Sequence, residues 1–284
     1  MRQDKQSLAW LKKVGTCLMI TFAGLVMTNC GSDDNGEPGN DIPNKPDTPV
    51  TPIMPNLNAY AQAIVDDMVM VAPGTFLMGS PDTDADAENA EKPQHSVTIA
   101  RHYLIGKFEV TQQLWQDVMG VNPSGFEGAT RPVERVSYND VQAFLVKLNE
   151  KAGVTFTLPT EEEWEYAARG GQNSTWKYAG SDNVDEVAWY KANSESRTHD
   201  IEETKAKLKP NSLGIYNMSG NVEEWTCTNW KANYLETTTA NPNSYAVRGG
   251  EWAYDNLSSR VAQRHAHQPT ELYADLGFRI VLEL

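Results

Sequence analysis

The sequence predicts an α+β fold with little regular secondary structure. Three observations lead to this prediction. Short apolar segments with strand-like alternation open the folded part, three segments with helical spacing follow, and the chain beyond residue 171 is rich in glycine, asparagine and tryptophan without a long helical period. We therefore expect a small mixed sheet, two or three short helices and many ordered loops.

Bounding residues place the strands and helices. Two short apolar strands flank Pro73-Gly74, and further strands are expected at 95–99 and 103–110. Residues 161–163 are acidic, which suits the positive end of a helix better than a general-acid pair. The helix starts and ends are marked, in chain order, by Thr111, Gly120, Ser137, Gly153, Thr160 and Gly170. Later strands near 246–248, around 261 and at 277–281 are expected to pair with the first ones.

Residues 1–29 are expected to be a lipoprotein signal peptide. Four basic residues precede a short apolar run at 14–26, which is too short to cross a bilayer comfortably. The run ends at Cys30 and resembles a bacterial lipoprotein signal, although Asn29 departs from the usual small residue. An ordinary cleaved signal is the alternative. Acidic residues after Cys30 resemble surface-export signals of Bacteroides-group lipoproteins, so we expect a lipid-anchored protein of the outer membrane or cell surface.

Two further regions follow the signal. Residues 30–57 begin with the lipidated cysteine and continue as a disordered tether rich in proline and aspartate. Residues 58–284 form one domain with a sizeable core. Its single cysteine, Cys227, excludes an internal disulfide and is most simply a small buried hydrophobe, with a reactive thiol as the alternative.

The charge of the chain argues against nucleic acid as a partner. Residues 1–30 hold four of the 24 basic and one of the 38 acidic side chains, which leaves the rest of the chain with a net charge of −17. A chain this acidic has no basic patch that could release counterions from a phosphate backbone. Acidic surfaces favour solubility and suit divalent cations.

The segment 217–225 is expected to form a rigid, buried loop. It places glycine, asparagine and carboxylate between apolar residues, which is too irregular for a helix or strand and too apolar for a solvated loop. The backbone groups of a buried loop must be satisfied internally. A hard cation held by oxygen ligands is one way to satisfy them.

Several short motifs together resemble the formylglycine-generating enzyme, or sulfatase-modifying factor, family over residues 67–284. In chain order they are Pro73-Gly74-Thr75-Phe76, Glu109-Val110-Thr111, Pro132-Val133-Glu134-Arg135, Leu158-Pro159-Thr160-Glu161, Trp164-Glu165-Tyr166-Ala167, the 217–225 segment, Arg248-Gly249-Gly250 and Gly277-Phe278-Arg279. The resemblance implies a distorted C-type-lectin-like fold with bound calcium. It also implies copper- and oxygen-dependent oxidation of a sulfatase cysteine to formylglycine.

The resemblance fails at the residues that this reaction needs. The family uses two thiolates after Arg-Gly-Gly to hold Cu(I), which thiolate suits and hydroxyl does not. Here the first thiol position falls at Tyr254 and the second at Asn256 or Ser259, depending on where a gap is placed. Glu251 stands where the enzymes usually have serine, and Glu223 where they usually have tryptophan. Copper is therefore not expected.

The residues that hold calcium in the family have counterparts in this chain. The cation loop of the family maps onto the side chains of Asn217 and Glu224 and the carbonyls of Gly220 and Val222, all compatible with hard oxygen ligation. The alternative is that Asn217 and Glu224 only bond loop amides.

Two other groups of residues are candidates for a role. His265 and His267 alternate as a metal pair on one strand face would, although exposed loop histidines are the simpler interpretation. The arginines 248, 260, 264 and 279 are expected to form internal ion pairs with Asp255 and Asp275. A shallow groove for an extended ligand or sugar is possible among tryptophans and neighbouring residues. The candidate groove residues are Glu251, Trp252, Tyr254, Arg264 and His265.

Three functions remain open. The first is a surface-anchored, non-catalytic domain that binds a protein or glycan, which the anchor and the missing thiols favour. The second is a formylglycine-generating oxidase that acts in sulfatase maturation. The third is a structural lipoprotein of an outer-membrane gliding or secretion assembly. We favour the first.

Overall fold

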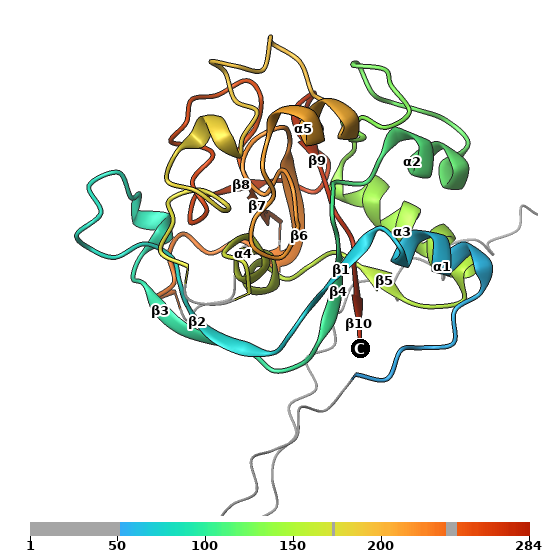
Figure 1. Cartoon of the computed structure of the whole chain (residues 1–284), viewed down its shortest axis with the longest axis horizontal. Helices are drawn as coiled ribbons and strands as arrows, with labels where there is room; N and C mark the ends of the chain where they lie inside the picture. The colour runs from blue at the N-terminus through green and yellow to red at the C-terminus, as the bar shows by residue number, and fades with distance from the viewer. Residues whose placement is uncertain (1–51, 172–173, 237–242) are drawn as a thin grey trace, which may run out of the picture. The chain divides into compact units, whose positions relative to one another are not determined.

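The computed structural model describes residues 52–171, 174–236 and 243–284, so the expected signal peptide, Cys30 and most of the tether lie outside the described residues. Residues 52–284 form one compact unit of short strands and helices joined by long loops (Figure 1). The α+β prediction is confirmed. No helix in these described ranges is both long enough and apolar enough to cross a membrane.

The first sheet joins the two ends of the domain. Its antiparallel strands lie in the order β1-β4-β10-β5, so the last strand pairs with one of the first, as expected. Their bounds are β1 Met68–Val71, β4 Tyr103–Gly106, β10 Val281–Glu283 and β5 Phe156–Thr157. The two strands that flank Pro73-Gly74 do not pair with each other. The second, β2 (Gly74–Met78), forms a separate two-stranded sheet with β3 (His95–Ile99).

The second four-stranded sheet carries the candidate site. Its order is β8-β7-β6-β9, with β9 parallel to β6 and the other pairs antiparallel. Its bounds are β6 Glu223–Asn229, β7 Tyr245–Arg248, β8 Arg264–His267 and β9 Leu276–Gly277. The strand expected around residue 261 begins instead at 264. The expectation that β7 pairs with the first strands was wrong, because its neighbours are β6 and β8.

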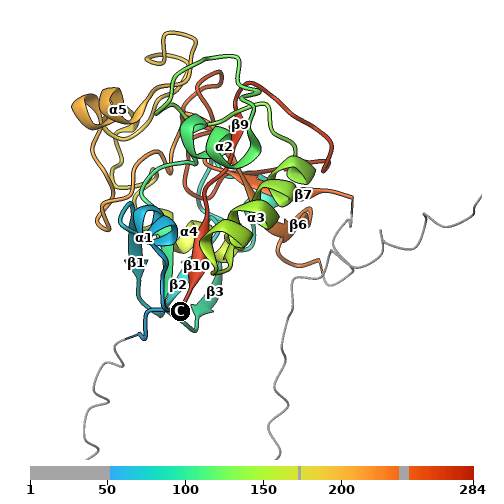
Figure 2. The same ribbon diagram turned by 90° about the vertical axis from the view of Figure 1, so that its right-hand side faces the viewer.

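The helix starts follow the predicted caps. The side chains of Thr111, Ser137 and Thr160 each accept a hydrogen bond from the backbone N–H three residues on. The helices are α1 Ala59–Val65, α2 Gln112–Met119, α3 Tyr138–Ala152, α4 Glu161–Ala168 and α5 Ile201–Lys207. In Figure 2, α1 and α3 lie beside β10, and their apolar faces join one core cluster. Helix α4 packs with β2 and β3 in the other cluster.

Candidate functional site

A tight turn after β7 shapes the segment that holds the thiol positions. Gly249 and Gly250 have φ of 99° and 68°, a region that favours glycine. A Cβ on Gly250 would overlap the backbone of Ser258, so the chain leaves the turn and returns against it. The glycines thereby close residues 251–258 into a compact loop.

This loop points the thiol positions in different directions. The Tyr254 side chain is 58% exposed, whereas Ser259 is fully buried and its hydroxyl has no partner among the described residues. Asn256 donates from Nδ2 to the Tyr178 hydroxyl at 3.1 Å. Within the part of the chain that the structure describes, Cys227 lies on β6, where it is partly buried and packs against the core.

A carboxylate with two histidines occupies the neighbouring strands. Glu223 on β6 accepts from His265 Nδ1 at 2.7 Å and from His267 Nε2 at 3.1 Å. His267 also donates from Nδ1 to Glu271 at 3.1 Å. Both imidazoles lie on one face of β8, as expected for alternate residues of a strand. Among the described residues, no group of three or more histidine, cysteine or acidic side chains is arranged to hold a metal ion.

The electrostatics of this group follow from burial and hydrogen bonding. Burial alone would raise the pKa of Glu223, but the two histidines outweigh it and lower that pKa to about 2. The hydrogen bond to Glu223 raises the pKa of His265. Burial opposes a charged His267, yet its bonds to Glu223 and Glu271 raise its pKa as well. The group is therefore a carboxylate bonded to two imidazole rings, whose protonated forms it favours.

Glu251 lies next to this group as a buried neutral acid. Its side chain is 4% exposed, and Oε2 has no hydrogen-bond partner among the described residues. Burial, together with the charges of Glu223, Asp275 and Asp255, raises the pKa of Glu251 to about 10. A side chain of this kind is protonated at neutral pH and can donate a hydrogen bond.

The arginines form buried ion pairs, but with different partners from those expected. Arg264 makes two bonds to Glu161, at 2.6 and 2.7 Å, and Arg260 makes two to Glu91 at the same distances. Arg248 contacts both Glu161 and Glu165. The expectation that Asp255 and Asp275 pair with these arginines was wrong. Two of these glutamates, Glu161 and Glu165, come from α4, so the first-turn residue Glu161 both favours the helix start and anchors Arg248 and Arg264.

The predicted calcium loop surrounds one excess negative charge. Glu224 accepts two bonds from Arg279 at 2.6 Å, and its Oε2 also accepts from Trp164 at 2.7 Å. The buried Glu109 accepts from Nδ2 of Asn217 at 3.0 Å and from Asn221 at 2.8 Å. Two carboxylates thus face one guanidinium. Burial raises the pKa of Glu109 to about 7, which is one way of relieving this imbalance.

The same loop has acceptor capacity to spare. Oδ1 of Asn217 is buried and has no partner among the described residues. A carboxylate offers about four lone-pair sites, and the bonds to Glu224 use three of them. These oxygen atoms are suitable ligands for a hard cation.

Residues 53–284 match the model of the sulfatase-modifying factor enzyme 1-like domain family. The chain belongs to this family. It is 35% identical to the chaperone protein LppX of Paenibacillus barcinonensis, over 77% of this chain and 90% of the relative. It is 31% identical to the formylglycine-generating enzyme of Streptomyces coelicolor, over 69% of each chain. The inactive Cα-formylglycine-generating enzyme 2 of Bos taurus is 26% identical, over 67% of this chain.

Solved structures confirm the family fold. Treponema denticola variable protein 1 superposes with a TM-score of 0.67 at 31% identity, over 76% of this chain and 95% of that protein. PvdO from Pseudomonas aeruginosa superposes with a TM-score of 0.66 at 26% identity, over 76% and 94% of the two chains.

The candidate groove residues of this sulfatase-modifying-factor domain differ in accessibility. Trp252 donates from Nε1 to the Ala274 carbonyl at 3.1 Å and packs edge-on against Phe126. Tyr254 is exposed and His265 is partly exposed, whereas Glu251 and Arg264 are buried. Accessible contacts at this surface therefore come from Tyr254, with smaller parts of Trp252 and His265.

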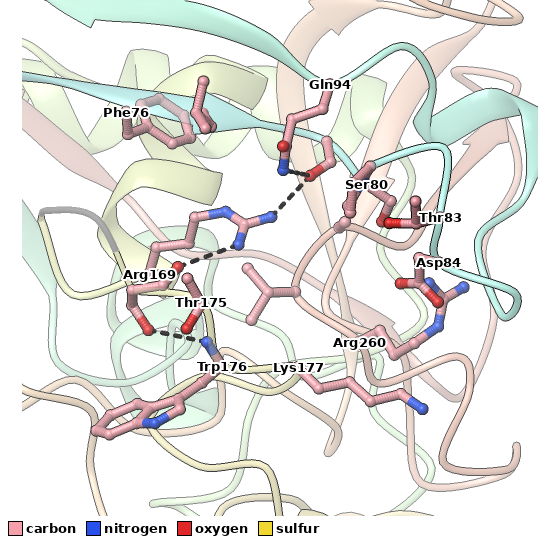
Figure 3. Close-up of a pocket in the computed structure, with 16 residues that line it drawn as sticks. Phe76, Ser80, Thr83, Asp84, Gln94, Arg169, Thr175, Trp176, Lys177 and Arg260 are labelled. Carbon is pink, nitrogen blue, oxygen red and sulfur yellow. Dashed lines mark hydrogen bonds between the residues drawn. The ribbon is translucent and has the colours of Figure 1, made fainter.

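Sequence reasoning missed a separate cavity of about 500 Å³. Its walls come from the end of β2 and the following loop, the segment 174–177, and residues 260–262 directly after the thiol positions (Figure 3). Trp176 lines this cavity and is 43% exposed, which depends on the tertiary structure and leaves no local signal in the sequence.

Proposed function

We propose that the protein is a membrane-tethered, non-catalytic sulfatase-modifying-factor domain that binds a protein or glycan ligand. The observation that carries this proposal is the absence of the thiol pair. The family positions hold Tyr254 and either Asn256 or Ser259, and oxygen side chains are poor ligands for Cu(I). The differing directions of these side chains support the same conclusion.

Two residues near the positions of the missing thiols differ from those usual in the copper enzymes, and neither supports copper chemistry. The Glu223 carboxylate is already bonded to two histidines, and Glu251 is a buried acid. Neither supplies the soft sulfur ligands of the copper enzymes. The accessible groups at this surface are the exposed Tyr254 ring and parts of Trp252 and His265.

The proposal includes calcium as a structural ion. The side chains of Asn217 and Glu224 and the carbonyls of Gly220 and Val222 would hold it, and the ion would neutralise the excess negative charge shared with Glu109. It also includes a lipid on Cys30, which would hold the domain at the outer membrane or cell surface. The acidic tether after Cys30 supports this location.

The relatives are compatible with a role outside catalysis. One is named an inactive enzyme, and the Paenibacillus relative is named a chaperone protein. The second name favours one further candidate, which is binding of an exported polypeptide. Light scattering of chemically unfolded lysozyme tests it, because a chaperone would suppress aggregation at near-equimolar ratio.

Peptide oxidation tests the main proposal. A cysteine peptide from a sulfatase would be incubated with copper, oxygen and either this protein or the Streptomyces coelicolor enzyme, and followed by mass spectrometry. We expect formylglycine only with the Streptomyces enzyme. Turnover by this protein that exceeds the copper-only control would contradict the proposal.

A further inference from the structure

The basic side chains around the cavity of Figure 3 are already paired with carboxylates. Arg169 pairs with Glu165 at 2.7 Å, Lys177 with Asp86 at 2.5 Å, and Arg260 bidentately with Glu91. An anionic ligand would have to compete with these carboxylates, and a cationic ligand with these basic groups. Asp84 also lines the cavity and has no ion-pair partner among the described residues. Its carboxylate repels an anionic ligand and can accept hydrogen bonds from the hydroxyls of a neutral one, so the cavity favours a neutral ligand that carries hydroxyls.

The same ion pairs fix the walls of the cavity. Arg169 also donates to the carbonyls of Gly79 at 3.1 Å and Ser174 at 3.4 Å, which joins the end of β2 to the segment 174–177. Val261 donates from its backbone N–H to the Lys177 carbonyl at 2.9 Å, which joins the third wall. A cavity held in this way loses little conformational freedom when a ligand binds.

The remaining lining is part hydroxyl and part apolar. The hydroxyls of Thr83 and Thr175 have no hydrogen-bond partner among the described residues and are available to a ligand. Leu77 and Pro81 supply apolar lining. The Trp176 indole lies at the edge of the cavity in Figure 3. The indole offers a flat apolar face together with an N–H donor.

An uncharged ligand that carries both apolar faces and many hydroxyls matches this lining. Saccharides have these properties, because the C–H face of a sugar ring packs on an aromatic ring while its hydroxyls bond polar side chains. We infer that the cavity between β2, Trp176 and Arg260 is a binding site for a neutral oligosaccharide. This inference rests on the proposed function and names glycan as its ligand class.

A glycan array probed with the whole purified chain tests the inference. The array would carry neutral, sialylated and sulfated oligosaccharides, and the strongest neutral binder would then be titrated calorimetrically. We expect retention of neutral glycans and at least a tenfold loss of affinity in Trp176→Ala, which corresponds to about 1.4 kcal/mol. Tyr273→Ala is the matched control, since Tyr273 is an exposed aromatic residue that does not line the cavity, and Tyr254→Ala tests the candidate groove instead.

Each other outcome overturns the inference. No retention of any glycan, a preference for sulfated or sialylated glycans, or an unchanged affinity in Trp176→Ala would each do so. Loss of binding in Tyr254→Ala alone would place the glycan site at the loop of residues 251–258 instead. Thermal unfolding of the three variants checks that they fold. Failure here leaves the non-catalytic proposal standing, because that proposal fails only through peptide oxidation or copper binding.

Discussion

Glu223 and His265 lie 2.7 Å apart, carboxylate oxygen to imidazole Nδ1, on two strands that are separated by β7. His267 approaches the other oxygen of the same carboxylate. This contact places a carboxylate–imidazole bridge where the resemblance leads us to expect a tryptophan. The bridge ties β6 to β8 across the sheet that supports the former thiol loop.

Glu223→Gln should destabilise the protein most at mildly acidic pH. The lowered pKa of Glu223 stabilises the fold above about pH 4.5, and this stabilisation is lost as the pH falls towards 2. The raised pKa values of His265 and His267 stabilise the fold below about pH 6.5, and this stabilisation is lost as the pH rises through those raised values. We expect a loss of about 3 kcal/mol in urea unfolding at pH 5.5 and less at pH 8.5. Glu202→Gln, at an exposed position, is the control. An equal loss at both pH values would refute this account.

Glu251→Gln should stabilise the protein at alkaline pH. The pKa of Glu251 is raised to about 10, so the fold accommodates its neutral carboxylic acid better than its carboxylate. The contribution of Glu251 to the free energy of unfolding therefore declines as pH rises from about 4.5 towards 10. An amide of the same shape carries no such charge. We expect near-equal stability at pH 5 and a gain on the order of 3 kcal/mol at pH 9. Asp255→Asn, at an exposed residue, should show no comparable gain.

Arg248→Met should be among the more damaging single changes. Arg248 is fully buried against Glu161 and Glu165, so its removal leaves carboxylates without their main partner. We expect the free energy of unfolding to fall by about 3–5 kcal/mol. Lys205→Met breaks a solvent-exposed pair with Glu202 and should change it by less than about 1 kcal/mol. Chemical denaturation of both variants would show whether the two effects differ as expected.

Calcium should raise the thermal midpoint of the wild-type protein relative to the same sample in chelator. Saturation a hundredfold above Kd adds about 2.7 kcal/mol of stability. Asn217→Ala removes the spare buried oxygen and should abolish the calcium-induced increase. Asn221→Ala is the matched control, because it also loses a bond to Glu109 but keeps the Asn217 oxygen. A calcium response that survives in Asn217→Ala would place the ion elsewhere.

Local features of this chain were predictable and long-range pairings were not. The caps at Thr111, Ser137 and Thr160 depend on residues three positions apart, so the sequence displays them directly. The fold followed from many separate motifs in the right order. The strands beside Pro73-Gly74 entered different sheets, because strand pairing is decided by distant partners.

The site shows the same limit. The alternation of His265 and His267 predicted a shared strand face, but their contact with Glu223 brings together residues more than forty positions apart. The glutamate partners of the arginines lie up to 169 positions away in the chain. The cavity likewise depends on several separate segments, so no local pattern marks it.

Binding of Cu(I) is the most direct test of the non-catalytic account. The protein and its Cys227→Ser variant would be titrated calorimetrically with Cu(I) under anaerobic, reducing conditions, after calorimetry has shown that both are folded. We expect no tight one-to-one binding in either sample. Tight one-to-one binding that persists in Cys227→Ser would contradict the account, because it would show a copper site built without the thiol pair.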